Sequence, residues 1–250
     1  WWHDGYPSRQ PDSVYRDKFM PYYKSGAPAI RARARVVNLN PDSALTEFEF
    51  DTQANVIGAD SRPVWVAYYT KDTPYKQEAE TLRASLIKHG VLHEIWDVPN
   101  RGDWQRNTQY KAQFILDMVK RHWGRSIVYT DADSVLMRVP ELLDAAAARD
   151  DVDFMAYYHR QKELLSGTFF LRCNDAAIIL CKLWQEKCNE NIKLWDQRCM
   201  QMVLDGGRWK GRFEKLPVEY CCIFDANPDV RKPVVVHNQA SRRLKKVVSV

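Results

Sequence analysis

From residue 63 onward, segments with the pattern of buried strands alternate with segments that have the period of amphipathic helices. The strand pattern, rich in β-branched and aromatic residues, covers residues 63–70, 91–99, 126–130 and 152–160, and returns after a turn within 164–174. The helix pattern covers residues 71–90, 107–124, 140–150 and 175–188. This alternation predicts an α/β fold with a mostly parallel sheet between helices.

Capping and breaking residues set the expected ends of these helices. Asp72 or Thr73 is expected to cap the first helix, with Pro74 in its first turn and Gly90 at its end. Asn174 is expected to cap the helix that follows residue 174.

Residues 1–62 have a different character and are expected to form an N-terminal extension to a domain of residues 63–250. They mix aromatic residues, Pro, Gly and Arg with little periodicity. Such a segment packs through its aromatic side chains or contacts a partner. Within it, "TEFEFDTQ" (46–53) alternates apolar and polar residues, which suits a short edge strand.

Composition sets broad limits on the function. A hydrophobic content of 45% in 250 residues supports a packed core, and a net charge of +5 permits an anionic partner without requiring one. None of the six cysteines belongs to a C-x-x-C pair, which argues against a zinc site. Free buried thiols in a reducing compartment are expected, although an even count leaves disulfides open.

Targeting signals give little information. No apolar run is long enough for a membrane span, and no signal peptide is recognisable. A cytoplasmic location is the expectation, in the host cytoplasm if the source is viral. The sequence begins at Trp1 rather than Met, so a native leader or anchor could have been removed.

Two aspartates stand at the end of the predicted strand 126–130. Asp131 and Asp133 are separated by one residue, and ligands of α/β sheets bind at the carboxyl ends of strands. Carboxylates so close resist joint ionisation unless a cation lies between them, and oxygen ligands suit Mg²⁺ or Mn²⁺. The alternative is a pair of solvated turn residues.

Four segments together resemble GT-A-fold glycosyltransferases of the glycogenin-like family 8 and related retaining families, which use nucleotide sugars. They are "VYTDADSVLMRVPELLD", "LLSGTFFLRCNDAAIIL", "WDQRCMQMVL" and "VVVHNQASRR". They occur in the family's order and cover about residues 63–243. Leu165 departs from the pattern, because the family usually has Asn there. The resemblance implies a GT-A fold and transfer of a sugar from a nucleotide-diphosphate sugar, usually a UDP-sugar, to a hydroxyl.

The resemblance implies a metal site and a donor site. Asp131, Asp133 and His237 would hold Mn²⁺ or Mg²⁺. The donor-binding residues would be Tyr69, Thr70, Lys111, Asp131, Ala132, Ser166, Gly167, Ser241 and Arg242. Tyr69 and Thr70 would meet the nucleobase, and Ser241 and Arg242 the diphosphate. The structural alternatives are a buried structural histidine for His237, core packing for Tyr69 and a surface lysine for Lys111. For Ser241 and Arg242 the alternative is a solvated basic tail.

Asp196 and Gln197 would be the residues nearest to the chemistry. The neutral amide of Gln197 cannot be a general base, but it could steady an oxocarbenium-like transition state in a retaining enzyme. An inverting enzyme would need a base instead, for which the candidates are Asp196, Glu219 and His159.

Two functions of other classes compete with this one. A sugar nucleotidyltransferase would carry a Gly-rich loop after its first strand, but "YYTKDTPYKQ" has no glycine there. A nucleic-acid-binding module would use the clusters "RARAR" and "RRLKK", yet it would leave the paired aspartates unexplained.

The acceptor remains open between two kinds of hydroxyl. One is carried by a glycan, a lipid or a protein. The other is carried by a hydroxymethylated base in DNA, as in some phage enzymes of this general type. The basic termini favour DNA, which would be held through its phosphates with the target base flipped out.

Overall fold

The computed structural model describes residues 12–32, 36–38, 47–50 and 61–244. The chain divides into two compact units, Trp1–Asp60 and Ser61–Val250. Each unit is described by itself below.

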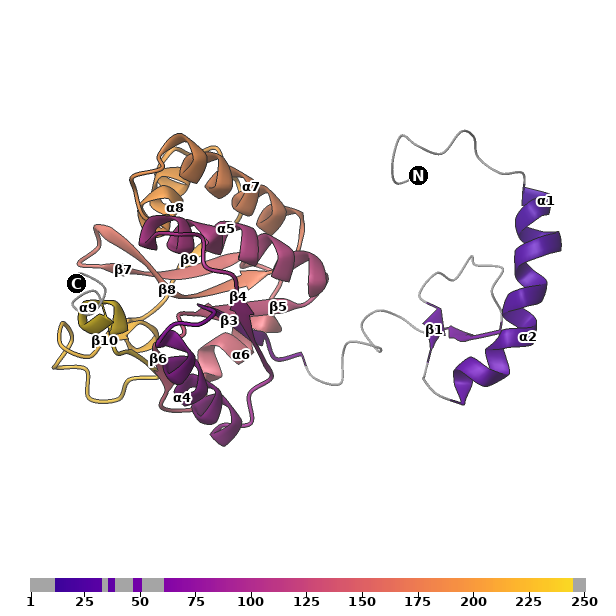
Figure 1. Ribbon diagram of the computed structural model, residues 1–250, viewed down its shortest axis with the longest axis horizontal. Helices are drawn as coiled ribbons and strands as arrows, with labels where there is room; N and C mark the ends of the chain where they lie inside the picture. Colours follow the sequence, from indigo (N-terminus) through magenta and orange to yellow (C-terminus); the bar gives the residue numbers. More distant parts are fainter. Residues whose placement is uncertain (1–11, 33–35, 39–46, 51–60, 245–250) are drawn as a thin grey trace. The chain divides into compact units, whose positions relative to one another are not determined.

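The first unit is a helical segment with a small strand pair (Figure 1). Helix α1 (Asp12–Val14) continues through the π-helical η1 (Tyr15–Phe19) into α2 (Met20–Arg31), and β1 (Val37–Asn38) pairs in parallel with β2 (Glu49–Phe50). Strand β2 lies within the predicted edge strand, whose other residues are mostly outside the described part of the chain. The last three residues of "RARAR" also lie outside it.

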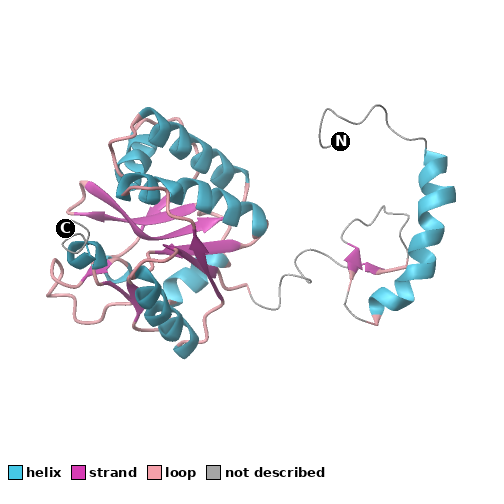
Figure 2. Ribbon diagram, viewed as in Figure 1, coloured by secondary structure: helices cyan, strands magenta, loops and turns pink. Residues whose placement is uncertain are grey.

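The second unit is built on a central sheet of six strands in the order β4-β3-β5-β8-β7-β9. Figure 2 shows strands of this unit with helices around them. The strands are β3 (Val64–Thr70), β4 (His93–Val98), β5 (Ser126–Thr130), β7 (Phe154–His159), β8 (Glu163–Arg172) and β9 (Phe213–Lys215). Strand β8 runs antiparallel to both neighbours, and the other adjacent pairs are parallel. The predicted α/β fold with a mainly parallel sheet is confirmed.

Helices cover both faces of this sheet (Figure 1). They are α4 (Tyr75–Lys88), α5 (Trp104–Arg121), α6 (Glu141–Ala147), α7 (Asp175–Glu190) and α8 (Asp196–Asp205). Phe114 of α5 and Trp184 of α7 share one core cluster, whereas Leu82 of α4 and Leu143 of α6 share the other. The sheet therefore forms the middle of three layers.

A smaller sheet brings the C-terminal segment to the edge of the main sheet. It has the order β10-β11-β6, formed by β10 (Cys222–Ile223), β11 (Val235–His237) and β6 (Ser134–Leu136). The 3-10 helix η2 (Val218–Tyr220) precedes β10, and α9 (Ala240–Leu244) follows β11. Because β6 comes directly after β5, this sheet holds the C-terminal segment beside the paired aspartates.

Some predicted boundaries are wrong. Helix α4 is capped by Pro74 without a side-chain hydrogen bond, because Asp72 has a positive φ of 58° and the hydroxyl of Thr73 donates to the carbonyl of Thr70 instead. Helix α5 begins three residues before residue 107, because Asp103 accepts a hydrogen bond from the backbone N–H of Arg106 and caps it.

The turn expected at the start of residues 164–174 is also wrong, since strand β8 already begins at Glu163. The preceding turn contains Arg160 and Gln161, both at positive φ. The predicted cap Asn174 is confirmed: its side-chain oxygen accepts a hydrogen bond from the backbone N–H of Ala177 at 3.1 Å.

Candidate active site

A cavity of about 340 Å³ opens at the carboxyl ends of β3 and β5. The predicted site residues Tyr69, Thr70, Lys111, Asp131, Ala132, Asp133, Ser166, Asp196, Gln197 and Ser241 all line it. The fold therefore brings together side chains from β3, α5, the β5–β6 turn, β8, α8 and α9.

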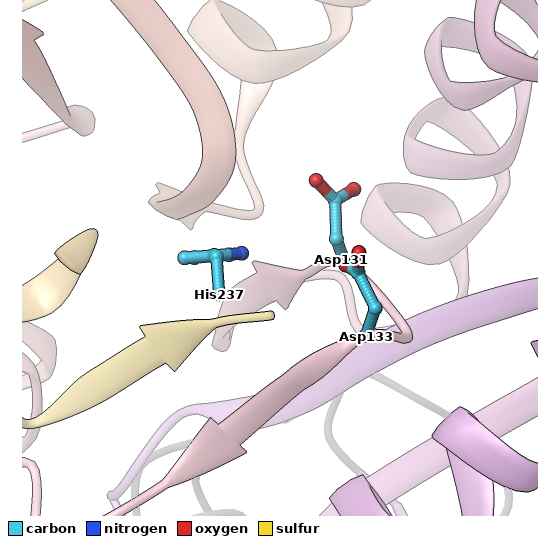
Figure 3. Close-up of side chains that lie close together, drawn as sticks. All are labelled: Asp131, Asp133 and His237. Carbon is cyan, nitrogen blue, oxygen red and sulfur yellow. The ribbon is translucent and has the colours of Figure 1, made fainter. Parts of the chain in front are cut away.

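Strand pairing places His237 beside the two aspartates. The β5–β6 turn is closed by a hydrogen bond from the backbone N–H of Ser134 to the carbonyl of Asp131, and Ser134 pairs with His237 across β6 and β11. One ligand atom from each of Asp131, Asp133 and His237 lies within 4.8 Å of the other two. In Figure 3 a ring nitrogen of His237 lies on the side of the two carboxylates.

The imidazole of His237 is held neutral and in one orientation. Its burial lowers its pKa to about 4, although the charge of Asp131 acts in the opposite direction. Its Nε2 lies 2.9 Å from the hydroxyl oxygen of Thr168. If Nε2–H donates to that hydroxyl, Nδ1 keeps its lone pair, as a metal ligand requires.

The carboxyl of Asp133 is partly buried and close to a second acid. Burial and the charge of Asp131 raise its pKa to about 6, against the hydrogen bond that it accepts at 2.7 Å from the backbone N–H of Ala240. A cation at this place would favour the charged carboxylate and reverse that shift.

Lys111 links the paired aspartates to α8 through a buried ion-pair network. Its Nζ lies 3.0 Å from Oδ1 of Asp131 and 3.0 Å from Oδ2 of Asp196, and its side chain is 6% exposed. Burial alone would lower the pKa of Lys111, but the two carboxylates outweigh it and raise the pKa well above its ordinary value. Lys111 is therefore charged, and the surface-lysine alternative is wrong.

Further hydrogen bonds orient the same carboxylates. The hydroxyl of Tyr129 donates to Oδ1 of Asp131 at 2.8 Å, and the hydroxyl of Ser166 donates to Oδ2 of Asp196 at 2.9 Å. Asp196 is 4% exposed, so it faces Lys111 and Ser166 rather than open solvent.

Gly167 on β8 lies beside the triad formed by Asp131, Asp133 and His237. A Cβ at this position would come within 2.9 Å of Cε1 of His237 and 3.3 Å of Oδ2 of Asp131. The backbone also contributes, since the N–H of Asp131 donates to the carbonyl of Gly167 at 2.8 Å. The absence of a side chain thus permits the approach of β8 to the triad.

Gln197 lies half-buried at the edge of the cavity with its amide engaged at both ends. Its Oε1 accepts a hydrogen bond from the backbone N–H of Ser166 at 3.2 Å, and its Nε2 donates to Oε1 of Glu163 at 2.9 Å. A carboxylate accepts but does not donate, so this arrangement allows one amide orientation.

Gly167 and His237 do not line the cavity themselves but lie beside Asp131, which does. Three other predicted residues lie elsewhere. Arg242 does not line the cavity; its guanidinium pairs with the carboxylate of Asp225. His159 ends β7 and Glu219 lies in η2, and neither lines the cavity. Of the proposed bases for an inverting reaction, only Asp196 lines the cavity, and it is paired with Lys111.

Several lining residues were not singled out from the sequence, among them Tyr75, Trp104, Tyr129, Trp195 and Gln239. The helical spacing of Trp104, Thr108 and Lys111 on α5 could have indicated a shared face. Burial and the nearby charge of Asp133 raise the pKa of Tyr75.

The cysteines agree with a simpler expectation, and the helices were also compared with the length and apolarity of a membrane span. All six cysteines are free and buried, as predicted, and burial raises the pKa of the Cys173 thiol to about 12. Within the described part of the chain, every helix is too short or too polar to cross a membrane.

Comparison with solved structures identifies the fold. A glycosyltransferase involved in the glycosylation of the major capsid of PBCV-1 aligns with a TM-score of 0.57 and 15% sequence identity, over 76% of this chain and 100% of that one. The glycosyltransferase GlyE of Streptococcus pneumoniae TIGR4 aligns with a TM-score of 0.48 and 16% identity, over 70% of this chain and 54% of that one. A search of curated protein sequences finds no match.

A family model described as nucleotide-diphospho-sugar transferase matches residues 86–247. The match contains the paired aspartates, the Ser166–Gly167 strand, the Asp196–Gln197 helix and His237. The GT-A-like fold and the cavity at its carboxyl edge agree with that match. The chain therefore belongs to the nucleotide-diphospho-sugar transferase family and is a glycosyltransferase.

Proposed function

We propose that the chain transfers a sugar from a nucleotide-diphosphate sugar, with UDP as the favoured carrier, in a reaction that depends on Mn²⁺ or Mg²⁺. The observation that carries this proposal is the triad of Asp131, Asp133 and His237, whose ligand atoms lie within 4.8 Å in a chain of this family. Two carboxylates and a neutral imidazole are a donor set that suits these cations. Bound there, the cation would neutralise the diphosphate leaving group.

The residues around the triad would prepare the donor site. Lys111 and Tyr129 occupy Oδ1 of Asp131, which directs Oδ2 toward the side of Gly167 and His237. Ala132 and Ser166 line the cavity beside them. This preorganisation favours binding because fewer groups must be ordered when the donor arrives.

The nucleobase and the diphosphate of the donor would then lie along the cavity. Tyr69 and Thr70 at the end of β3 would contact the nucleobase, and Ser241 on α9 the diphosphate. Arg242 would have to leave Asp225 in order to reach the same phosphates.

The site favours retention of the anomeric configuration. The carboxylates that line the described cavity are Asp131, Asp133 and Asp196. The first two belong to the triad, and Asp196 is paired with Lys111, so each has a role other than that of a general base. Gln197 would stabilise positive charge that develops on the sugar. The anomeric proton signal of the product, measured by NMR, tests whether the configuration is retained.

The acceptor is a hydroxyl, for which two classes remain from the sequence. The basic clusters support DNA with a hydroxymethylated base, whereas the fold itself carries no preference. Binding to such DNA should weaken steeply as salt rises, because phosphate contacts release counterions. A flat salt response would exclude the DNA acceptor.

The six free thiols support a reducing compartment such as the cytoplasm.

Nucleotide release from a panel of nucleotide sugars tests the proposed function. We expect release that requires Mn²⁺ or Mg²⁺ and falls at least 100-fold in Asp133→Asn, since a lost ligand costs several kcal/mol of leaving-group stabilisation. The exposed Asp150→Asn should behave as wild type. Equal release in the presence of EDTA would refute the metal dependence.

A further inference from the structure

The cavity wall next to Gln197 carries an exposed tryptophan. Trp195 directly precedes Asp196 and Gln197, lines the cavity and is 42% exposed. Trp104, the first residue of α5, lines the same cavity and is 37% exposed. Large aromatic faces open to solvent beside a reaction centre indicate a surface that a substrate covers.

Helix capping does not account for the tryptophan at this position. Trp195 is the N-cap of α8, where Ser, Thr, Asp and Asn are preferred, and its side chain makes no capping hydrogen bond. The indole is not a core residue either, because it is exposed. A position that departs from the local preference without a packing gain indicates a functional role.

The segment before α8 is supported from two sides. The side-chain amide of Gln109 on α5 donates to the carbonyls of Asn191 and Leu194 at 3.0 and 2.6 Å. The indole of Trp184 donates to the carbonyl of Asp196 at 2.8 Å. These bonds hold the backbone on both sides of Trp195, so its ring is presented from a rigid support.

The charges at this end of the cavity disfavour a polyanion. Lys111 is the one cation among the described lining residues, and it is already paired with Asp131 and Asp196. The exposed carboxylate of Glu163 lies 2.9 Å from the amide of Gln197. A DNA phosphate backbone would meet repulsion here, whereas a neutral polyhydroxyl compound would meet hydrogen-bonding groups.

We propose that Trp195 forms an acceptor subsite for a neutral carbohydrate, in the cavity that Trp104 also lines. The ring of Trp195 would pack against the apolar C–H face of a sugar unit, while the polar edge of that sugar faces Gln197 and Glu163. This inference rests on the proposed function, because it names the acceptor of the same site.

Nucleotide release from UDP-sugars with Mn²⁺ tests it, with maltotriose, cellotriose, xylotriose and chitotriose as acceptor probes. We expect at least one of them to increase release over donor hydrolysis. Trp195→Ala should raise KM for that saccharide at least tenfold more than KM for the donor, and Trp195→Phe should restore most of the loss. Trp123→Ala, which removes another exposed indole just beyond the far end of α5, should match wild type.

The outcomes separate the two proposals. No release with any donor would contradict the proposed function itself. Donor hydrolysis that none of the saccharides increases, or that only hydroxymethylated duplex DNA increases, would overturn the carbohydrate subsite. An unchanged KM for the active saccharide in Trp195→Ala would overturn it as well.

Discussion

At the scale of single residues, the site depends on a buried lysine that faces inward. Lys111 is 5% exposed and contacts carboxylates from two separate elements. A buried charge is costly unless it is paired, so the lysine and the two aspartates stabilise one another. The same network fixes Asp131 before any ligand binds.

Replacement of Lys111 should therefore affect stability as well as activity. We expect Lys111→Met to lower the free energy of unfolding by about 3 kcal/mol, because it leaves Asp196 buried without its partner. Urea unfolding followed by circular dichroism measures this. The exposed Lys120→Met on the same helix should change it by less than about 0.5 kcal/mol. Equal effects of the two substitutions would contradict the network.

Asp133 makes a pH-dependent contribution to the free energy of unfolding of the metal-free protein. Its folded-state pKa of about 6 lies above the ordinary value of 3.8, so its contribution to stability is present below pH 4 and lost as pH rises through 6. The loss is on the order of 2 kcal/mol between pH 4 and 7. His237, whose pKa is lowered to about 4, acts in the opposite direction.

The difference between wild type and Asp133→Asn isolates this contribution. Unfolding in EDTA should show that the variant gains stability relative to wild type as pH rises from 4 to 7. A difference that is independent of pH would contradict the raised pKa.

At the scale of elements, the close approach of β8 and β11 decides the geometry of the triad. We expect Gly167→Ala to weaken Mn²⁺ binding at least tenfold, since the new methyl group would come within 2.9 Å of His237. Titration followed by electron paramagnetic resonance measures the bound ion. Gly26→Ala, where a Cβ meets open space, is the control. Unweakened binding in a folded Gly167→Ala protein would place the ion elsewhere.

The strands and helices with strong periodicity could be predicted from sequence. Strand β5 has the predicted bounds, and α7 begins after its predicted cap Asn174. Element boundaries that depend on tertiary contacts could not be predicted from local sequence. Strand β8 extends back to Glu163 because it pairs with the end of β7, and no local pattern reveals that pairing.

The site was partly predictable because its residues follow strand ends. Asp131 and Asp133 are placed by β5, and the resemblance supplied His237, far away in sequence. The pairing of Lys111 with Asp196 could not be predicted, because it depends on how α5 and α8 pack. The sequence predicted that Arg242 contacts the donor diphosphate, but an ion pair with Asp225 holds its side chain outside the cavity. That ion pair could not be predicted from the sequence either.

At the scale of the whole molecule, the cavity and its core belong to the unit Ser61–Val250. We expect a chain of residues 61–250 to fold with an unchanged melting temperature for its main transition and to keep donor hydrolysis. Differential scanning calorimetry and nucleotide release measure this. Loss of folding in the truncated chain would show that residues 1–60 support the catalytic unit.

The most direct test of the central claim is UDP binding measured by calorimetry with and without Mn²⁺. The triad of Asp131, Asp133 and His237 predicts that Mn²⁺ tightens UDP binding at least tenfold in wild type and has no such effect in Asp133→Asn. UDP binding of equal strength with Mn²⁺ and with EDTA would contradict a metal-assisted donor site.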